Sequence, residues 1–383
     1  MSHVLETLAD LVRINSVNSA YEGGPGEAGV AAYVRRFFEQ RGIEVREQEV
    51  FPGRNNVIAR VPGRSTTPPI ILEAHMDTVS TKGMTIAPFD PVVRDGRLYG
   101  RGSVDDKAGL AAMMHAAAEI HASSEKPPGD VWMAAVVDEE FSFRGVVKLC
   151  EGLQARAAIV AEPTEMRCVI ASKGCVRWRI RTRGKAAHSA KPHLGINAIT
   201  AMSRVVLALQ NDHDSLQNHP HPLLGPATCN VGVMRGGVQV NFVPDEAVIE
   251  IDRRLLPGEE LESVLAHYQG ILDALMQHHP EVLAEMEPPM LSDWPFQTDA
   301  GHPFIHLCQD VLRSMQREDG VCGVPFCSDA SKFARLGIPT VLFGPGSIDQ
   351  AHAAIEYVEC AQVEEAVTFY RAAAQRFGGG THA

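Results

Sequence analysis

The chain has 383 residues, a formal net charge of −12, 45% hydrophobic residues and 21% charged residues. This length exceeds the roughly 250–300 residues that one hydrophobic core usually supports, so we expect two domains. The acidic balance excludes a nucleic-acid or anionic-membrane surface, because such surfaces require clustered Lys and Arg. Small molecules are the expected partners.

The sequence gives no sign of a membrane span or a secretory leader. No apolar run reaches about eighteen residues. The N-terminus instead places Leu5, Leu8, Leu11 and Val12 at the spacing of a helix. The eight cysteines are scattered without zinc-finger spacing, which favours reduced thiols in a cytoplasmic protein. Residues 378–383 are expected to form a flexible tail.

The first part of the chain alternates between strand and helix patterns. Amphipathic or Ala-rich segments predict helices, and short apolar runs predict strands buried on both faces. After the N-terminal helix, helices are expected at 27–41 and 107–121, and strands at 43–50, 56–61, 70–74, 131–137 and 157–161. This order predicts a doubly wound α/β layer.

The pattern changes near Lys173. Residues 176–182 alternate between apolar and polar side chains, as in a strand with one face in water. A helix at 196–209, strands at 228–234 and 247–253, and a helix at 260–278 follow. This order resembles a ferredoxin-like layer inserted into the α/β domain. A helix at 304–316, a strand at 340–343 and a helix at 362–376 resume the first pattern. We therefore assign residues 1–174 and 290–383 to the outer domain, and 175–289 to the insertion.

The segment Glu73–Thr78 follows a buried strand and places His75 two residues before Asp77. Strand alternation points both side chains to one side, in the manner of a metal ligand and a carboxylate that orients its ring. A single His-x-Asp pair is common in proteins without metals, so this pair needs support from other residues.

Further acidic and imidazole groups follow the predicted strands of the outer domain, where open α/β sheets form their ligand crevice. They are Asp105, Glu139, Glu140, Glu162 and His352. Clustered acids repel one another unless a cation neutralises them, so a divalent metal pair is expected. Two imidazoles with several carboxylates suit zinc, and cobalt or manganese is also acceptable. Water between two such ions ionises near neutral pH, and a free carboxylate is then needed as general base.

Four motifs resemble, in order, those of the M20 family of di-zinc metallopeptidases and deacylases. This family includes acetylornithine deacetylase, succinyl-diaminopimelate desuccinylase and carboxypeptidase G2. The motifs lie at residues 100–107, 138–140, 161–164 and 351–358, so the resemblance covers nearly the whole chain. It implies a metal-dependent hydrolase acting on amide bonds, with an α/β catalytic domain and an inserted lid and dimerisation domain.

The resemblance implies a role for each residue of the cluster. His75 is similar to a terminal metal ligand whose ring Asp77 orients, and Asp105 to the carboxylate that bridges two zinc ions. Glu139 resembles the general base that passes a proton from water to the leaving amine. Glu140 and His352 would bind one metal, and Glu162 the other.

The insertion contributes a second set of motifs. His188, in the segment 184–189, resembles the family's lid histidine, which reaches the partner subunit's site and stabilises the oxyanion. Asn241 and Arg254 look like polar contacts to a substrate carboxylate. Ser331 departs from the pattern, since several relatives carry an arginine there; the neighbouring Lys332 offers a point charge without the bidentate fork of Arg.

The sequence therefore predicts a cytoplasmic, homodimeric di-zinc amidohydrolase of amino-acid metabolism that removes an N-acyl group from an N-acyl-L-amino acid. The alternative within enzymes is an exopeptidase of the same family that cleaves dipeptides or a C-terminal residue. A non-catalytic metal-binding relative would lack a ligand or the base, and neither is missing here.

Overall fold

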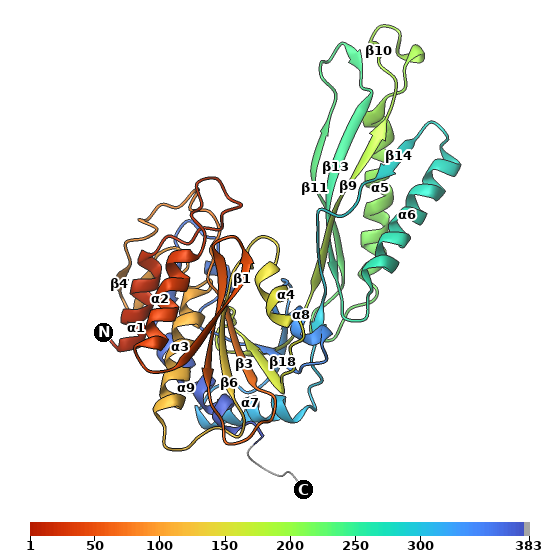
Figure 1. Ribbon diagram of the computed structural model, residues 1–383. Helices are drawn as coiled ribbons and strands as arrows, with labels where there is room; N and C mark the ends of the chain where they lie inside the picture. Colours follow the sequence, from red (N-terminus) through yellow and green to blue (C-terminus); the bar gives the residue numbers. More distant parts are fainter. Residues whose placement is uncertain (379–383) are drawn as a thin grey trace. The chain divides into compact units, whose positions relative to one another are not determined.

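The computed structural model describes residues 1–378, so residues 379–383 of the expected tail lie outside the described part. The chain divides into two compact units (Figure 1). Unit 1 comprises Met1–Ile170, Gln297–Cys322 and the chain from Ser328 onward. Unit 2 comprises Ala171–Phe296 and Gly323–Cys327. No helix of residues 1–378 is both long enough and apolar enough to cross a bilayer.

Unit 1 is built on a mixed sheet with a parallel centre. The strand order is β1-β2-β6-β3-β7-β18-β8-β16, with β17 beside β8. The neighbours β6 (Val131–Val136), β3 (Ile70–His75), β7 (Ala157–Val160) and β18 (Thr340–Leu342) run parallel. Around them lie β1 (Glu44–Phe51), β2 (Arg54–Val61), β8 (Cys168–Ser172), β16 (Phe296–Gln297) and β17 (Val321–Val324). The expected α/β class is confirmed, and β1 and β2 add antiparallel strands at one edge.

Helices flank this sheet as the sequence patterns predict. The predicted ones are α1 (His3–Arg13), α2 (Ala28–Glu39), α3 (Lys107–Ala122), α7 (Pro303–Ser314) and α9 (Cys360–Arg376), and the short helices α4 (Arg144–Cys150) and α8 (Ala330–Arg335) are additional. The central helix α3 is rich in Ala and Met, and it is buried on nearly every side because it packs against β3, α1 and α9. Its first residue follows Asp105 and Asp106 directly, so the helix fixes where this loop ends.

Unit 2 has the connectivity of a ferredoxin-like fold. Its elements follow in the order β9 (Gly174–Arg183), α5 (Ala198–Leu216), β11 (Thr228–Gly236), β13 (Glu246–Leu255), α6 (Leu261–His278) and β14 (Leu283–Met286). The sheet order is β11-β13-β9-β14 with antiparallel pairs, and β15 (Leu291–Asp293) also pairs with β9. Unit 2 therefore has the ferredoxin-like α+β fold that the sequence predicts.

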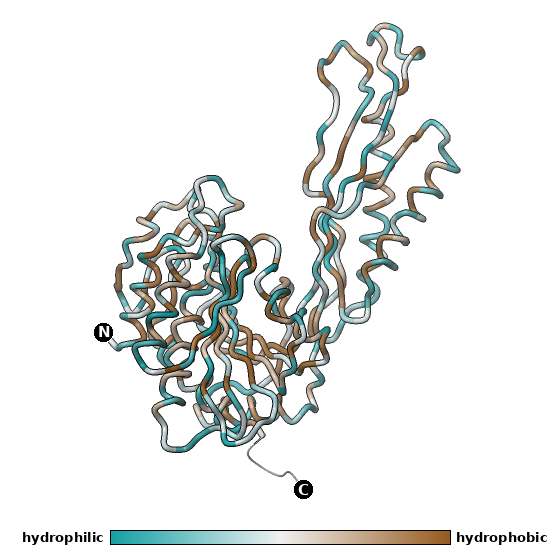
Figure 2. The backbone as a smooth tube through the Cα atoms, viewed as in Figure 1, coloured by the Kyte–Doolittle hydropathy of each residue, from teal (hydrophilic) through white to brown (hydrophobic). Residues whose placement is uncertain are grey.

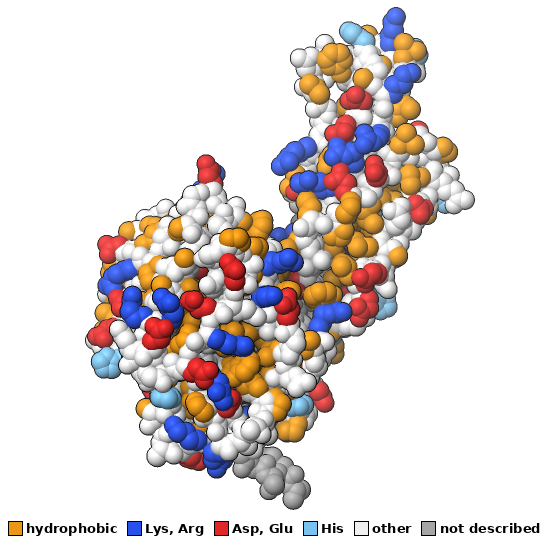
Figure 3. Space-filling model, viewed as in Figure 1, with side chains coloured by type: hydrophobic (Ala, Val, Ile, Leu, Met, Phe, Trp, Pro, Cys, Tyr) orange, Lys and Arg blue, Asp and Glu red, His pale blue; other side chains and the backbone are white. Residues whose placement is uncertain are grey.

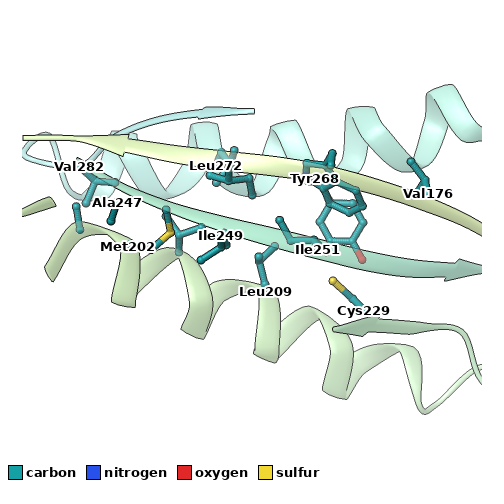
Figure 4. Packing of buried hydrophobic residues seen from close by; sticks show 14 of the residues in the cluster. Val176, Met202, Leu209, Cys229, Ala247, Ile249, Ile251, Tyr268, Leu272 and Val282 are labelled. Atoms are coloured by element: carbon teal, nitrogen blue, oxygen red, sulfur yellow. The ribbon is translucent and has the colours of Figure 1, made fainter. Parts of the chain in front are cut away.

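One face of this sheet packs against α5 and α6, and the other carries ion pairs. Trp178 of β9 lies with its ring centroid 5.0 Å from that of Tyr268 of α6, and Figure 4 shows side chains of both helices and of β13 in the core. Both helices alternate between hydrophobic and hydrophilic stretches (Figure 2). On the opposite face, Arg179 pairs with Glu250 at 3.0 Å, and opposite charges gather there (Figure 3). Strand alternation thus separates core from solvent.

Most of the short elements were not predicted, although the short strands β7 and β18 were. The missed ones are β4 (Val92–Arg94), β5 (Arg97–Tyr99), β8, β10 (Ala187–His188), β12 (Phe242–Val243), β14, β15, β16, β17, β19 (Tyr357–Glu359), the helices α4 and α8, and the 3₁₀ turns η1 (Pro192–Leu194) and η2 (Ile348–Gln350). Most elements of two to seven residues are too short to show a hydrophobic period. The expected helix at 196–209 continues to Leu216, because the polar residues 210–215 extend the helix without extending its apolar face.

Candidate metal centre

Three neighbouring parallel strands end at one edge of the unit 1 sheet. His75 is the last residue of β3, whose neighbours are β6 and β7. Asp138, Glu139 and Glu140 follow β6, and Glu162 follows β7. Strand register pairs His75 with Val136, so the carboxyl ends of β3 and β6 are level. This is the position at which open α/β sheets bind ligands.

Asp105 lies between the two imidazoles. His75 Nε2 is 2.9 Å from Asp105 Oδ1, and His352 Nε2 is 3.2 Å from Asp105 Oδ2. His352 Nε2 is also 3.2 Å from Glu140 Oε2. Donor atoms of Asp105, Glu140 and His352 lie within 4.8 Å of one another, as they must to share a metal ion. This donor set of imidazoles and carboxylates fits a divalent cation such as zinc.

The carboxyl groups of the cluster are buried beside one another. Burial and the negative charge of Asp105 raise the pKa of Glu140 to about 7. Burial also raises the pKa of Glu139 and of Glu162 well above the usual value, and neighbouring acids add to both shifts. Hydrogen bonds to Asp105 and Glu140 raise the pKa of His352 to about 10 despite its partial burial. Such a site favours positive charge, which a bound metal ion supplies.

Asp77 connects the end of β3 to the turn after β6. Its carboxylate accepts hydrogen bonds from the backbone N–H groups of Glu139 and Glu140, each at 3.1 Å. The ring of His75 lies with Nδ1 3.0 Å from the backbone carbonyl of Asp77 and 3.5 Å from its carboxylate. The carbonyl is therefore the nearer group that orients the ring, and the carboxylate holds the turn.

Two further groups contact this centre, the Arg101–Glu356 pair and Asn18. Glu356 accepts from the backbone N–H groups of Val104 at 3.0 Å and Asp105 at 3.3 Å, and pairs with Arg101 at 2.5 Å. Arg101 and Glu356 lie in the motifs at residues 100–107 and 351–358, and their opposite charges were the sequence signal that could have indicated a pair. Asn18 donates to Asp77 at 2.7 Å, and nothing in the sequence distinguishes it from other turn asparagines.

The comparison with known proteins identifies the family. Residues 71–376 match the peptidase family M20/M25/M40. The chain belongs to this family. The resemblance and the expectation of an enzyme, a metal-dependent hydrolase, are thereby confirmed.

Curated relatives align along most of the chain. An acetylornithine deacetylase of Vibrio campbellii is 30% identical over 365 residues, which cover 92% of this chain and 93% of the relative. A probable succinyl-diaminopimelate desuccinylase of Staphylococcus epidermidis is 27% identical over 387 residues, with 92% of each chain covered.

Solved M20 structures share the fold. A tripeptidase from Staphylococcus aureus superposes with a TM-score of 0.82 at 22% identity over 97% of each chain. A dinuclear metal-binding peptidase of the M20 family from Bacillus subtilis gives a TM-score of 0.73 at 18% identity, covering 97% of this chain and 96% of its own.

The other predicted M20 site residues lie in unit 2. His188 is exposed on β10, and the backbone N–H of the next residue, Ser189, donates to the carbonyl of Asn241 at 3.0 Å. Arg254 is the second-last residue of β13, where it pairs with Asp252 at 2.7 Å. Register places Arg254 beside Cys175 and Glu246 beside Arg183, so about 25 Å of β13 separates Arg254 from Glu246. Arg183 and Glu246 are the strand ends that connect to the segments carrying His188 and Asn241. One copy of unit 2 does not bring these side chains together.

Lys332, the residue considered as a substitute for the family's arginine, is buried in α8 of unit 1. Its Nζ donates to the carbonyl of Ser328 at 3.3 Å and lies 3.5 Å from the centre of the Phe143 ring. The hydroxyl of Ser331 also donates to Ser328, at 3.2 Å. Both side chains therefore support the loop that precedes α8.

Proposed function

We propose that this M20 protein is a di-zinc amidohydrolase that removes the acyl group from an N-acyl-L-amino acid. The observation that carries the proposal is the placement of Asp105 between His75 and His352, at 2.9 and 3.2 Å, with Glu139 next to the ligating position Glu140. The choice of an N-acyl substrate is supported by the 30% identical acetylornithine deacetylase, which aligns with 92% of the chain.

In this proposal, five side chains hold the metals: His75, Asp105, Glu140, Glu162 and His352. Asp105 would serve both metal sites, His75 and Glu162 would complete one of them, and Glu140 and His352 would complete the other. Two zinc ions, with cobalt or manganese as substitutes, would polarise the amide carbonyl and lower the pKa of water. Asp77 keeps the ring of His75 and the turn of Glu140 in place.

Glu139 acts as the general base. Its carboxylate accepts the proton of the attacking water and delivers it to the nitrogen of the leaving amine. Because Asp77 accepts from the backbone N–H groups of both Glu139 and Glu140 at 3.1 Å, it holds the backbone of the base next to that of the ligating residue that follows.

The proposed enzyme is a homodimer in the cytoplasm, and residues 175–289 form its lid and dimerisation domain. His188 of the partner subunit would stabilise the developing oxyanion, while Asn241 and Arg254 would bind the substrate carboxylate. The separation of His188 on β10 from Arg254, which lies at the end of β13 beside Cys175, supports two different subunits as their source.

The test is amine release by zinc-loaded protein from a panel of N-acetyl-ornithine, N-succinyl-diaminopimelate, other N-acyl amino acids and simple dipeptides. We expect an N-acyl amino acid to be preferred, with activity lost on chelation and restored by metal. Preference for dipeptides would place the protein with the exopeptidases. If the fully metallated protein hydrolysed no member of the panel, both the deacylase and the exopeptidase assignments would be overturned.

A further inference from the structure

Asn18 lies at the junction of two chain segments beside the metal centre. Its backbone N–H donates to the carbonyl of Thr78 at 2.9 Å, and the N–H of Thr78 donates to Ser16 at 3.1 Å. These contacts place the segment after α1 next to the loop that follows β3. The Asn18 side chain is completely buried, so its polar atoms must find partners within the protein.

The hydrogen bonds of Asn18 determine the orientation of its amide. Its Oδ1 accepts from the backbone N–H of Ala20 at 2.9 Å. Its Nδ2 donates to Asp77 Oδ2 at 2.7 Å and to Asp138 Oδ1 at 3.0 Å. A primary amide has two N–H groups, and here each one serves a different carboxylate.

The two carboxylates belong to different loops. Asp77 follows β3 and holds the backbone N–H groups of Glu139 and Glu140. Asp138 follows β6 and adopts a φ of 71°, a left-handed conformation that residues other than glycine rarely adopt. Arg54 holds the carboxylate of Asp138 at 3.0 Å. Two buried carboxylates on either side of one nitrogen would repel each other if no donor lay between them.

We propose that Asn18 is a positioning residue that couples the His75 loop to the turn bearing Glu139 and Glu140. It does so by dividing its two amide hydrogens between Asp77 and Asp138. The side-chain hydrogen bonds of Asn18 go to none of the five proposed metal ligands, and it acts on them through these two carboxylates. The consequence for turnover rests on the proposed function, whereas the consequence for metal binding does not.

The test compares Asn18→Asp, which keeps the size of the side chain but replaces the donors with acceptors, and Asn18→Ser, which keeps one O–H donor. We expect zinc affinity, measured by chelator competition, to fall about 10–100-fold in Asn18→Asp and by less in Asn18→Ser. The visible absorption spectrum of the cobalt-substituted protein should change in both variants. With a substrate from the panel, kcat should fall while KM stays within about twofold.

Thr298→Val is the matched control. Thr298 is a buried residue of unit 1 that exchanges two hydrogen bonds with Thr340, at 2.6 and 3.0 Å, and its backbone N–H donates to Ile170. None of these partners belongs to the metal centre. This variant should lose stability with unchanged zinc affinity and cobalt spectrum.

Behaviour of the Asn18 variants like that of Thr298→Val would overturn the positioning role. If Asn18→Asp does not fold, Asn18→Ser decides by the same criteria. A shift in zinc affinity and cobalt spectrum in a protein that hydrolyses no member of the panel would refute the proposed function and leave the positioning role intact. Normal hydrolysis and unchanged metal binding in the variants would support the proposed function and overturn the positioning role.

Discussion

Glu139 is the residue whose loss separates chemistry from metal binding. It is the proposed base and not a ligand, so Glu139→Gln should keep both metals and lower kcat by about 10²–10⁴-fold. Turnover with the panel substrate and metal content by elemental analysis measure the two effects. Glu140→Gln is the paired control, because removing a proposed ligand should reduce metal content first. Near-normal turnover in Glu139→Gln would refute its assignment as base.

The Arg101–Glu356 pair makes a prediction about stability. Both side chains are buried, with 3% and 0% exposed. Glu356→Gln leaves the guanidinium of Arg101 without a counter-charge, which should lower the free energy of unfolding by about 3–5 kcal/mol. The nearby Arg97–Glu359 pair is 41% and 38% exposed, so Glu359→Gln should cost less than about 1 kcal/mol. Denaturant unfolding of both variants measures the difference, and equal losses would contradict this account.

At the scale of elements, the junction of α1, α2 and α3 contains a histidine that resists protonation. Burial, with smaller effects of Arg41 and His3, lowers the pKa of His115 to about 4. Its Nε2 lies 2.8 Å from the hydroxyl of Thr7, and its ring lies 5.2 Å from that of Phe37. The folded state therefore favours neutral His115, whereas the unfolded chain binds a proton near the ordinary pKa of histidine.

This shift predicts loss of stability in acid. The contribution of His115 is fully present above pH 6.5 and is lost as the pH falls towards 4. After allowance for solvent screening, wild-type protein should lose about 1 kcal/mol more than His115→Gln between pH 7 and 5. Urea unfolding of both proteins at the two pH values measures this. Parallel losses would show that His115 does not contribute.

At the scale of the whole molecule, the proposed dimer predicts complementation between inactive subunits. A Glu139→Ala subunit retains His188, and a His188→Ala subunit retains Glu139. If His188 acts on the partner's site, each mixed dimer contains one complete site, so random pairing should restore about a quarter of wild-type activity. Co-expression with two affinity tags isolates the mixed species. Activity no higher than that of the two parents would place His188 in its own subunit's site or outside catalysis.

The sequence by itself determined the classes of the elements and the residue types available for chemistry. Helix and strand periods are local properties, so the parallel centre of the sheet and the ferredoxin-like insertion could be predicted from hydrophobic spacing. Strand ends could also be located, which is why His75, Glu139 and Glu162 were proposed together. The antiparallel direction of β1 and β2, most strands of two to five residues and the last turns of α5 could not be predicted. Apolar spacing specifies neither strand direction nor the length of a polar helix end, and most very short strands show no hydrophobic period.

The tertiary structure alone decided which of these groups meet. Asp105 contacts His75 from 30 residues away, and His352 contacts Glu140 from 212 residues away. Such contacts depend on strand order and on packing between distant segments, which no local period encodes. For the same reason, Asn18 and the Arg101–Glu356 pair acquired roles only in the folded chain. The register of β9 and β13 likewise places Arg254 beside Cys175, at the opposite end of β9 from Arg183, the end that leads to His188, whereas the sequence motifs only gave the order of these residues.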